Sequence, residues 1–121
     1  IARIVAHCSY AHEPEWFTTA PGEAIKLVLN KAGMNSNEIG LWEINEAFSS
    51  VTMAAIDDFK INPDIVNVYG GAVAIGHPIG ASGARILVTL LNGMVKRNKR
   101  FGLAVLCIGG GEASAMILEK I

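Results

Sequence analysis

The sequence predicts an α/β domain with a mixed, mostly parallel five-stranded sheet and helices on both faces. Apolar segments rich in β-branched residues alternate with segments of helical periodicity along the 121 residues, which is typical of strands joined by crossover helices. The segment FGLAVLCI (101–108) is apolar almost throughout, as expected of a central strand covered on both faces. Only GGGE (109–112) separates it from the last apolar run, which predicts a hairpin and one antiparallel pair.

The first third of the chain is expected to form a strand and a helix. Residues 2–10 (ARIVAHCSY) are apolar and β-branched enough for a strand, and a loop follows them. Pro21 suits the first turn of a helix over 22–33, and Gly33 suits its end. Three apolar residues at helical spacing support this helix: Ile25, Val28 and Leu29.

The middle of the chain predicts two short strands and a second helix. LWEI (41–44) is expected to be a strand, and VNV (66–68) is expected to be another. Between them the apolar residues follow a helical period: Phe48, Val51, Ala55, Ile56 and Phe59. Asn45 is placed to cap this helix, because its side chain can accept a hydrogen bond from a backbone N–H.

The last third predicts one long helix and two strands. Residues 81–99 carry a strong apolar helical face, made of Ile86, Leu87, Leu90, Leu91, Met94 and Val95. The strands are expected over 101–108 and 113–121, so the elements follow the order β-α-β-α-β-α-β-β. A chain of this length provides one domain, over residues 1–121, and no room for a second core.

The composition limits the kinds of partner. A formal charge of −1 argues against nucleic acid as the main partner. Charged residues make up only 17% of the chain, below the roughly 25% usual for globular domains, so we expect a partner subunit or a further part of the same polypeptide to cover some of the surface. No apolar run reaches the roughly 18 residues needed to span a membrane, and no signal peptide is visible. Because the chain begins with Ile1, we expect it to be an excised or processed piece.

The two cysteines, Cys8 and Cys107, lie far apart in the sequence. Two cysteines at such a separation make neither a disulfide framework nor a metal-binding spacing, so we expect a reducing compartment and no metal. Cys8 has no motif around it and is expected to be structural.

Three polar residues follow three predicted strands. Asn45 follows 41–44, His77 follows 66–68 through a glycine-rich loop, and Cys107 ends 101–108. Ligands bind beyond the carboxyl ends of strands in open α/β sheets, so we expect these residues to converge at one edge. Each also has a structural interpretation: a surface histidine, a helix cap and a small buried hydrophobic residue. GHPIGASG (76–83) fits neither the dinucleotide-binding nor the P-loop pattern.

Three blocks carry a family resemblance. NEAF (45–48), NVYGGAVAIGHPIGASGARI (67–86) and CIGGGEASA (107–115) resemble, in order and spacing, the signature blocks of the C-terminal domain of thiolases. The acetyl-CoA acetyltransferase branch is most similar, and the similarity covers essentially the whole chain. Two departures lie outside the proposed catalytic positions: Glu112 with Ala113, where many relatives have Gln or Met and then Gly, and Tyr69, where relatives often carry Asn.

The resemblance implies a fold and a reaction. It implies one half of a layered thiolase-like fold, with the half that bears the nucleophilic cysteine absent from this chain. Thiolases convert two acetyl-CoA molecules to acetoacetyl-CoA and CoA by Claisen condensation, and they catalyse the reverse thiolysis. CoA thioesters are then substrates, and no permanently bound cofactor is expected. Without the nucleophile this chain alone is expected to be inactive.

The resemblance also implies roles for four residues. His77 would deprotonate the nucleophilic cysteine and, with a water oriented by Asn45, would form one oxyanion site; imidazole suits this because it titrates near neutral pH. The positive end of the following helix would keep the His77 ring neutral. Cys107 would be a second acid and base, which requires surroundings that stabilise a thiolate. The N–H of Gly109 would belong to a second oxyanion hole.

Several alternatives remain open at this stage. The chain is also compatible with half of a 3-ketoacyl-CoA thiolase of fatty-acid degradation, or with a non-catalytic assembly or binding module. A ketoacyl synthase is disfavoured, because that family typically has His at the position of Asn45 and no catalytic Cys before the paired glycines. The expected partners are the N-terminal half and further copies in a homodimer or homotetramer, with no nucleic acid and no membrane. The expected location is intracellular, and the sequence does not distinguish cytosol, mitochondrion and peroxisome.

Overall fold

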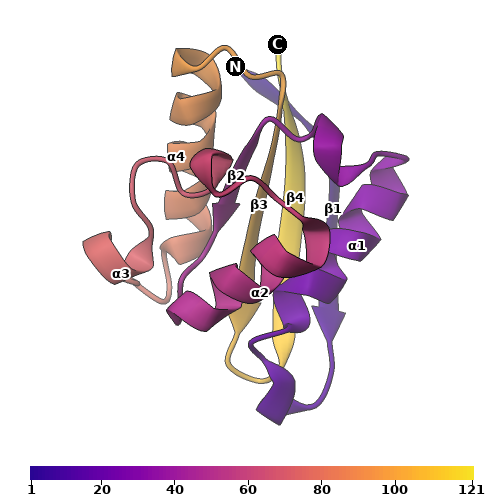
Figure 1. The fold of residues 1–121 in the computed structure, drawn as a ribbon, viewed down its shortest axis with the longest axis vertical. Coiled ribbons are helices and arrows are strands. Elements are labelled where there is room, and N and C mark those ends of the chain that lie inside the picture. Colours follow the sequence, from indigo (N-terminus) through magenta and orange to yellow (C-terminus); the bar gives the residue numbers. More distant parts are fainter.

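The computed structural model describes residues 1–121, which form a mixed four-stranded sheet between two layers of helices (Figure 1). The strands lie in the order β1-β4-β3-β2. Their bounds are β1 (Ala2–Ala11), β2 (Leu41–Ile44), β3 (Phe101–Ile108) and β4 (Glu112–Lys120). The helices are α1 (Ala20–Ala32), α2 (Ser49–Phe59), α3 (Ala72–Ile75) and α4 (Ser82–Lys96), with 3-10 turns at Pro14–Trp16, Ser36–Glu38 and Pro63–Ile65. The predicted α/β class, the mixed sheet and its two helical layers are confirmed.

The number and direction of the strands differ from the prediction. The sheet has four strands instead of five, and only β2 and β3 run parallel, because β4 pairs antiparallel with both β3 and β1. The strand expected over 66–68 is reduced to one parallel bridge between Trp42 and Val66. Its next residue, Asn67, has a φ of 45°, a left-handed conformation that turns the chain away from the extended path of a strand.

Helices α1 and α4 begin and end within three residues of the predicted positions. Pro21 lies in the first turn of α1, and Gly33 ends it with a φ of 65° and an N–H bonded to the Asn30 carbonyl. α4 begins at Ser82. α2, however, begins at Ser49, four residues after Asn45, so the prediction that Asn45 caps this helix was wrong.

The sheet separates two apolar cores. On one face α1 and α2 pack against alternate residues of the strands, among them Trp42, Leu103 and Val105. On the other face α4 packs Ile86, Leu90 and Met94 against the strand residues whose side chains point to that face, including Leu41, Ala104 and Leu118. α4 lies so close to β3 that a Cβ on Gly102 would meet the Met94 sulfur at 2.6 Å. β3 is therefore covered on both faces, as its apolar sequence predicts.

The parallel pair and α4 define one functional end of the sheet. Because β2 and β3 run in the same direction, their carboxyl ends lie at the same edge, at the lower end of the molecule in Figure 1. The first turn of α4 and the hairpin between β3 and β4 lie at this end too (Figure 1). Asn45, His77 and Cys107 all follow or end elements that terminate here.

Candidate active site

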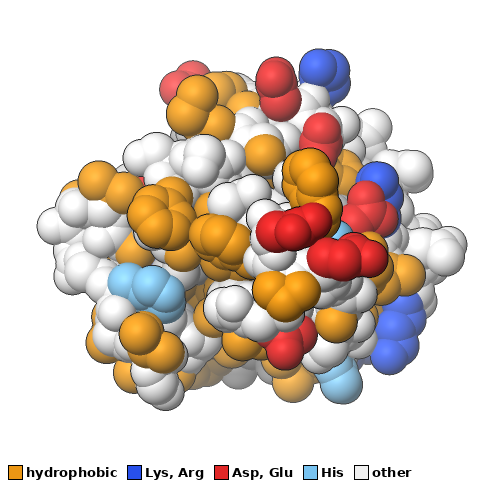
Figure 2. Space-filling view, turned by 90° about the horizontal axis from the view of Figure 1, so that it is seen from below, with side chains coloured by type: hydrophobic (Ala, Val, Ile, Leu, Met, Phe, Trp, Pro, Cys, Tyr) orange, Lys and Arg blue, Asp and Glu red, His pale blue; other side chains and the backbone are white.

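A hollow of about 560 Å³ opens at the carboxyl ends of β2 and β3. Seven of its nine lining residues are hydrophobic, so its walls are mainly apolar: Phe17, Ala47, Phe48, His77, Ile79, Leu106, Cys107, Ile108 and Gly109. Figure 2 shows this end of the molecule, where hydrophobic side chains gather around a histidine on one side and acidic side chains gather on the other. The structure therefore brings three of the four predicted site residues, His77, Cys107 and Gly109, to one hollow.

Asn45, the fourth predicted residue, lies behind His77. Its Nδ2 is 3.5 Å from the His77 Nε2, and its backbone N–H donates to the Val105 carbonyl at 2.9 Å, which continues the parallel pairing of β2 with β3. The side chain is fully buried, and its Oδ1 has no hydrogen-bond partner in the protein. Buried amide oxygens are seldom left unpaired, so this one is a candidate ligand for a water or a substrate group.

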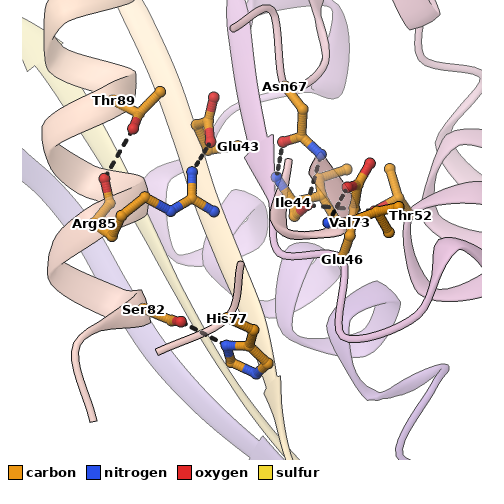
Figure 3. A network of polar contacts seen from close by, with 10 residues as sticks. All are labelled: Glu43, Ile44, Glu46, Thr52, Asn67, Val73, His77, Ser82, Arg85 and Thr89. Atoms are coloured by element: carbon orange, nitrogen blue, oxygen red, sulfur yellow. Dashed lines mark hydrogen bonds and ion pairs between the residues drawn. The ribbon is translucent and has the colours of Figure 1, made fainter. Parts of the chain in front are cut away.

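Ser82 sets the protonation pattern of the His77 ring. The Ser82 hydroxyl donates to the Pro78 carbonyl at 3.1 Å, so at 2.5 Å from His77 it accepts a hydrogen bond from Nδ1–H (Figure 3). The other ring nitrogen, Nε2, then presents its lone pair toward the Asn45 amide. The geometry thus makes Nε2 the unprotonated ring nitrogen, with the Asn45 amide as its partner at 3.5 Å. Ser82 was not predicted as a site residue; its place at the start of a predicted helix, five residues after His77, was the available signal.

The surroundings of Cys107 shift the pKa of its thiol. The side chain is buried, and this burial raises the pKa of its thiol above the ordinary value, although a backbone hydrogen bond partly offsets the effect. The thiol is therefore protonated at neutral pH.

The glycine turn after Cys107 leaves the backbone accessible. A Cβ added at Gly109 would meet no atom within 4 Å, so space beside its backbone is open to a ligand. Gly111 has a φ of 91°, and a Cβ there would lie 2.4 Å from the His12 carbonyl oxygen. This turn consequently needs glycine at position 111 for both reasons.

Two further polar residues hold the backbone next to Asn45. The Asn67 side chain bonds both backbone groups of Ile44: its Oδ1 accepts from the N–H at 2.9 Å, and its Nδ2 donates to the carbonyl at 2.8 Å (Figure 3). The Glu46 carboxylate accepts from the Val73 N–H at 3.0 Å and occupies the space where a Cβ on Gly71 would lie. The Asn67 side chain thus makes the two hydrogen bonds to the Ile44 backbone that a neighbouring strand would otherwise make. Neither contact was found from the sequence, although NEAF contains Glu46.

The remaining candidate groups lie elsewhere. Cys8 Sγ donates to the Ala24 carbonyl at 3.2 Å, and burial raises the pKa of its thiol, in agreement with the structural role expected for it. No group of three or more His, Cys, Asp and Glu side chains is arranged to hold a metal ion. None of the helices combines the length and the hydropathy required to cross a bilayer.

The chain resembles known proteins over its whole length. It is 50% identical to acetyl-CoA acetyltransferase 2 of Arabidopsis thaliana and 49% identical to the mitochondrial acetyl-CoA acetyltransferase of Rattus norvegicus, in each case over all 121 residues. These residues make up 30% and 28% of the two relatives, so the chain spans less than a third of their length.

Solved structures show the same similarity. The acetyl-CoA acetyltransferase of Bacillus anthracis superimposes with a TM-score of 0.97 at 36% identity, and the Acat5 thiolase of Ascaris suum, solved in complex with coenzyme A, with a TM-score of 0.92 at 48% identity. Each match covers all of this chain and 31% of the other. The family described as the thiolase C-terminal domain matches residues 1–120. With this match added to the fold and to the three signature blocks, the chain belongs to the thiolase C-terminal domain family.

Proposed function

We propose that this chain is the C-terminal catalytic half of an acetyl-CoA acetyltransferase. The observation that carries the proposal is the convergence of His77, Cys107 and Gly109 on one apolar hollow, with Asn45 behind His77. The enzyme would condense two acetyl-CoA molecules to acetoacetyl-CoA and CoA, and would catalyse the reverse thiolysis. The relatives from Arabidopsis thaliana, Rattus norvegicus and Bacillus anthracis are named acetyl-CoA acetyltransferases, which supports this branch.

His77 would act first, as the base for a nucleophilic cysteine supplied by the N-terminal half. Its Nε2 takes the thiol proton, the thiolate attacks the acyl carbon, and the carbonyl oxygen gains negative charge. The ring then carries N–H groups on both nitrogens, and Nε2–H can donate to a substrate oxygen. The Ser82 hydroxyl supports this step, because it holds Nδ1–H and so leaves Nε2 without a proton.

Asn45 would complete the oxyanion site beside His77. Its Nδ2 lies next to Nε2, and its unpaired Oδ1 provides an acceptor that can hold a water molecule in place. A water oriented in this way donates to the substrate oxygen as charge develops. Removal of one donor from such a site typically lowers kcat about 10²–10³-fold.

Cys107 would move the second proton. A buried thiol with a raised pKa begins as a proton donor, and both directions of the reaction need one. In synthesis the thiol protonates the departing CoA thiolate, and the resulting Cys107 thiolate removes a proton from the methyl group of the second acetyl-CoA. In thiolysis it protonates the enolate of acetyl-CoA when the carbon–carbon bond breaks, and it then deprotonates the incoming CoA thiol. The Gly109 N–H would stabilise the tetrahedral intermediate on the acyl-enzyme.

The substrate class follows from the hollow and from the relatives. Apolar walls with two reactive side chains suit a neutral thioester, and the Ascaris suum thiolase binds coenzyme A. These proton and acyl transfers use side chains and CoA alone, so no resident cofactor is proposed. We expect the whole protein to be a homo-oligomer. Relatives named as cytosolic in Gibberella zeae and as mitochondrial in rat favour an intracellular compartment.

The experiment compares the 121-residue chain with the full-length polypeptide that carries it, by following acetoacetyl-CoA thiolysis. The chain alone is expected to show no turnover, because the proposal assigns the nucleophilic cysteine to the N-terminal half, whereas the full-length protein is expected to be active. His77→Ala should lower kcat about 10²–10⁴-fold. Preference for acetoacetyl-CoA over long-chain 3-ketoacyl-CoA supports the acetyltransferase branch. Preference for long chains would assign a degradative thiolase, and an inactive full-length protein would favour an assembly module.

A further inference from the structure

A buried ion pair lies beside the proposed site. The Arg85 Nη1 donates to the Glu43 Oε2 at 3.3 Å, and the two side chains are 19% and 2% exposed (Figure 3). None of the proton transfers proposed above uses either group. The pair joins residues that lie 42 positions apart in the sequence, on β2 and α4.

Stability alone does not account for this pair. A buried ion pair loses the hydration of both charges, and apolar residues of similar volume are often equally stabilising or more so. Here burial raises the pKa of Glu43 to about 7 despite the attraction of Arg85, so desolvation outweighs the gain from pairing. The pair therefore calls for an explanation other than its contribution to folding.

The position of the pair provides one. Glu43 lies two residues before Asn45, and residues two apart in an extended chain point to the same face. Arg85 lies three residues after Ser82, which is about one helical turn, and Ser82 bonds the His77 ring. The ion pair thus ties the strand that leads to Asn45 to the helix turn that holds His77.

We propose that Glu43 and Arg85 are a positioning pair that sets the separation between the Asn45 amide and the His77 imidazole. The proposal rests on the function proposed above, in which these two groups bind one substrate oxygen. Neither Glu43 nor Arg85 touches the reacting atoms. A charged hydrogen bond between a guanidinium and a carboxylate has a defined length and direction, whereas apolar contacts between a helix and a sheet permit small sliding movements.

The test replaces the pair with apolar side chains of similar size in the full-length polypeptide. The double variant Glu43→Leu with Arg85→Met should fold with unchanged or higher stability. Its kcat for acetoacetyl-CoA thiolysis should nevertheless fall about 10²-fold, because a displacement of about 1 Å at a catalytic group has an effect of this size. The KM should change less than about threefold, since substrate binding does not depend on the pair.

Two further variants separate positioning from stability. Glu43→Gln keeps an acceptor for Arg85 and should restore kcat to within about fivefold of the parent, an effect on the scale of one hydrogen bond. Glu119→Gln is the matched control, because Glu119 is also buried and bound to arginines but lies where β4 pairs with the first residue of β3, at the opposite end of that strand from Cys107. It should leave kcat unchanged.

A crystal structure of the double variant gives a readout that does not depend on activity. We expect the distance from Asn45 Nδ2 to His77 Nε2 to increase from its present 3.5 Å. An unchanged distance together with an unchanged kcat would overturn the positioning role. If the parent full-length protein had no thiolase activity, the proposed function would fail, and the structural distance would still decide whether the pair positions the two side chains.

Discussion

Two buried glutamates on different strands, Glu43 on β2 and Glu119 on β4, respond differently to similar partners. Glu43 is 2% exposed and bonded to Arg85; Glu119 is 7% exposed and bonded to Arg3 and Arg100. Burial raises the pKa of Glu43 to about 7. Hydrogen bonds from Arg100 and then Arg3 lower the pKa of Glu119 below its ordinary value.

The difference comes from the surroundings of the arginines. Arg3 and Arg100 are 68% and 72% exposed, so they keep most of their hydration while two positive charges act on one carboxylate. Arg85 is largely buried and acts alone at 3.3 Å. The pairing of Glu119 with two exposed arginines therefore favours the charged carboxylate, whereas the pairing of Glu43 with Arg85 beside the candidate site does not. A strongly shifted pKa beside a candidate site is the pattern expected at functional sites.

The largest effect on stability is expected when Glu43 is removed from the Glu43–Arg85 pair and Arg85 is kept. Glu43→Ala leaves the buried Arg85 guanidinium without a partner and should lower the free energy of unfolding by about 3 kcal/mol. Glu119→Ala leaves arginines that are already in water and should lower it by about 1 kcal/mol. Urea unfolding of both variants measures the difference. Equal losses would mean that the exposure of the arginine partners does not set the cost of removing the glutamate.

The pH dependence of stability should have opposite signs at the two sites. The pKa of Glu43 rises from 4.5 in the unfolded chain to about 7, so the folded state binds the extra proton and stability falls as pH rises from 4.5 to about 7. The pKa of Glu119 is lowered, so its contribution is present above pH 4.5 and is lost as pH falls below that value. For Glu43 the change is on the order of 3 kcal/mol.

Single amide variants test these signs. Glu43→Gln should remove the decrease in stability between pH 4.5 and about 7. It should leave unchanged the loss of stability that occurs as the pH falls below 4.5. Glu119→Gln should reduce the loss of stability below pH 4.5 and leave the stability between pH 4.5 and about 7 unchanged. Thermal unfolding followed over this pH range distinguishes the two. A decrease that persists in Glu43→Gln would assign it to another group.

A smaller effect, on activity instead of stability, is expected at Ser82. Ser82→Ala removes the acceptor for the His77 Nδ1–H and should lower kcat about tenfold in the full-length protein, the effect of losing roughly 1.4 kcal/mol. Thr89→Ala is the control, because it removes a hydroxyl from the same helix that bonds only the Arg85 carbonyl. Steady-state kinetics that show equal losses for both would refute a specific role for Ser82.

The smallest effect is expected for an exposed pair of the same charges. Lys26 Nζ contacts the Glu23 carboxylate at 2.6 Å, but the side chains are 60% and 41% exposed. Lys26→Ala should change the free energy of unfolding by less than about 0.5 kcal/mol, since water competes for both groups. Chemical denaturation measures this. A change in unfolding free energy as large as that of Glu43→Ala would show that burial does not determine how much an ion pair contributes to stability.

Elements with local signals were predictable from the sequence. Pro21 and Gly33 mark the ends of α1 because proline fits the first turn of a helix and glycine fits a left-handed end. The apolar run 101–108 coincides with β3, since a strand buried on both faces needs apolar residues throughout. His77, Cys107 and Gly109 were identified by their motifs, and they line one hollow.

Pairings between distant residues were decided only by the tertiary structure. Whether 66–68 became a strand depended on Asn67, which bonds Ile44 across 23 positions, and Asn45 lies beside His77 instead of capping a helix. The Glu43–Arg85 contact and the raised pKa of the Cys107 thiol depend on packing, to which strands and helices far apart in the chain contribute. Local sequence determines backbone preference within a few residues, but the desolvation and hydrogen bonding that set the chemistry of a side chain depend on which distant segments pack around it.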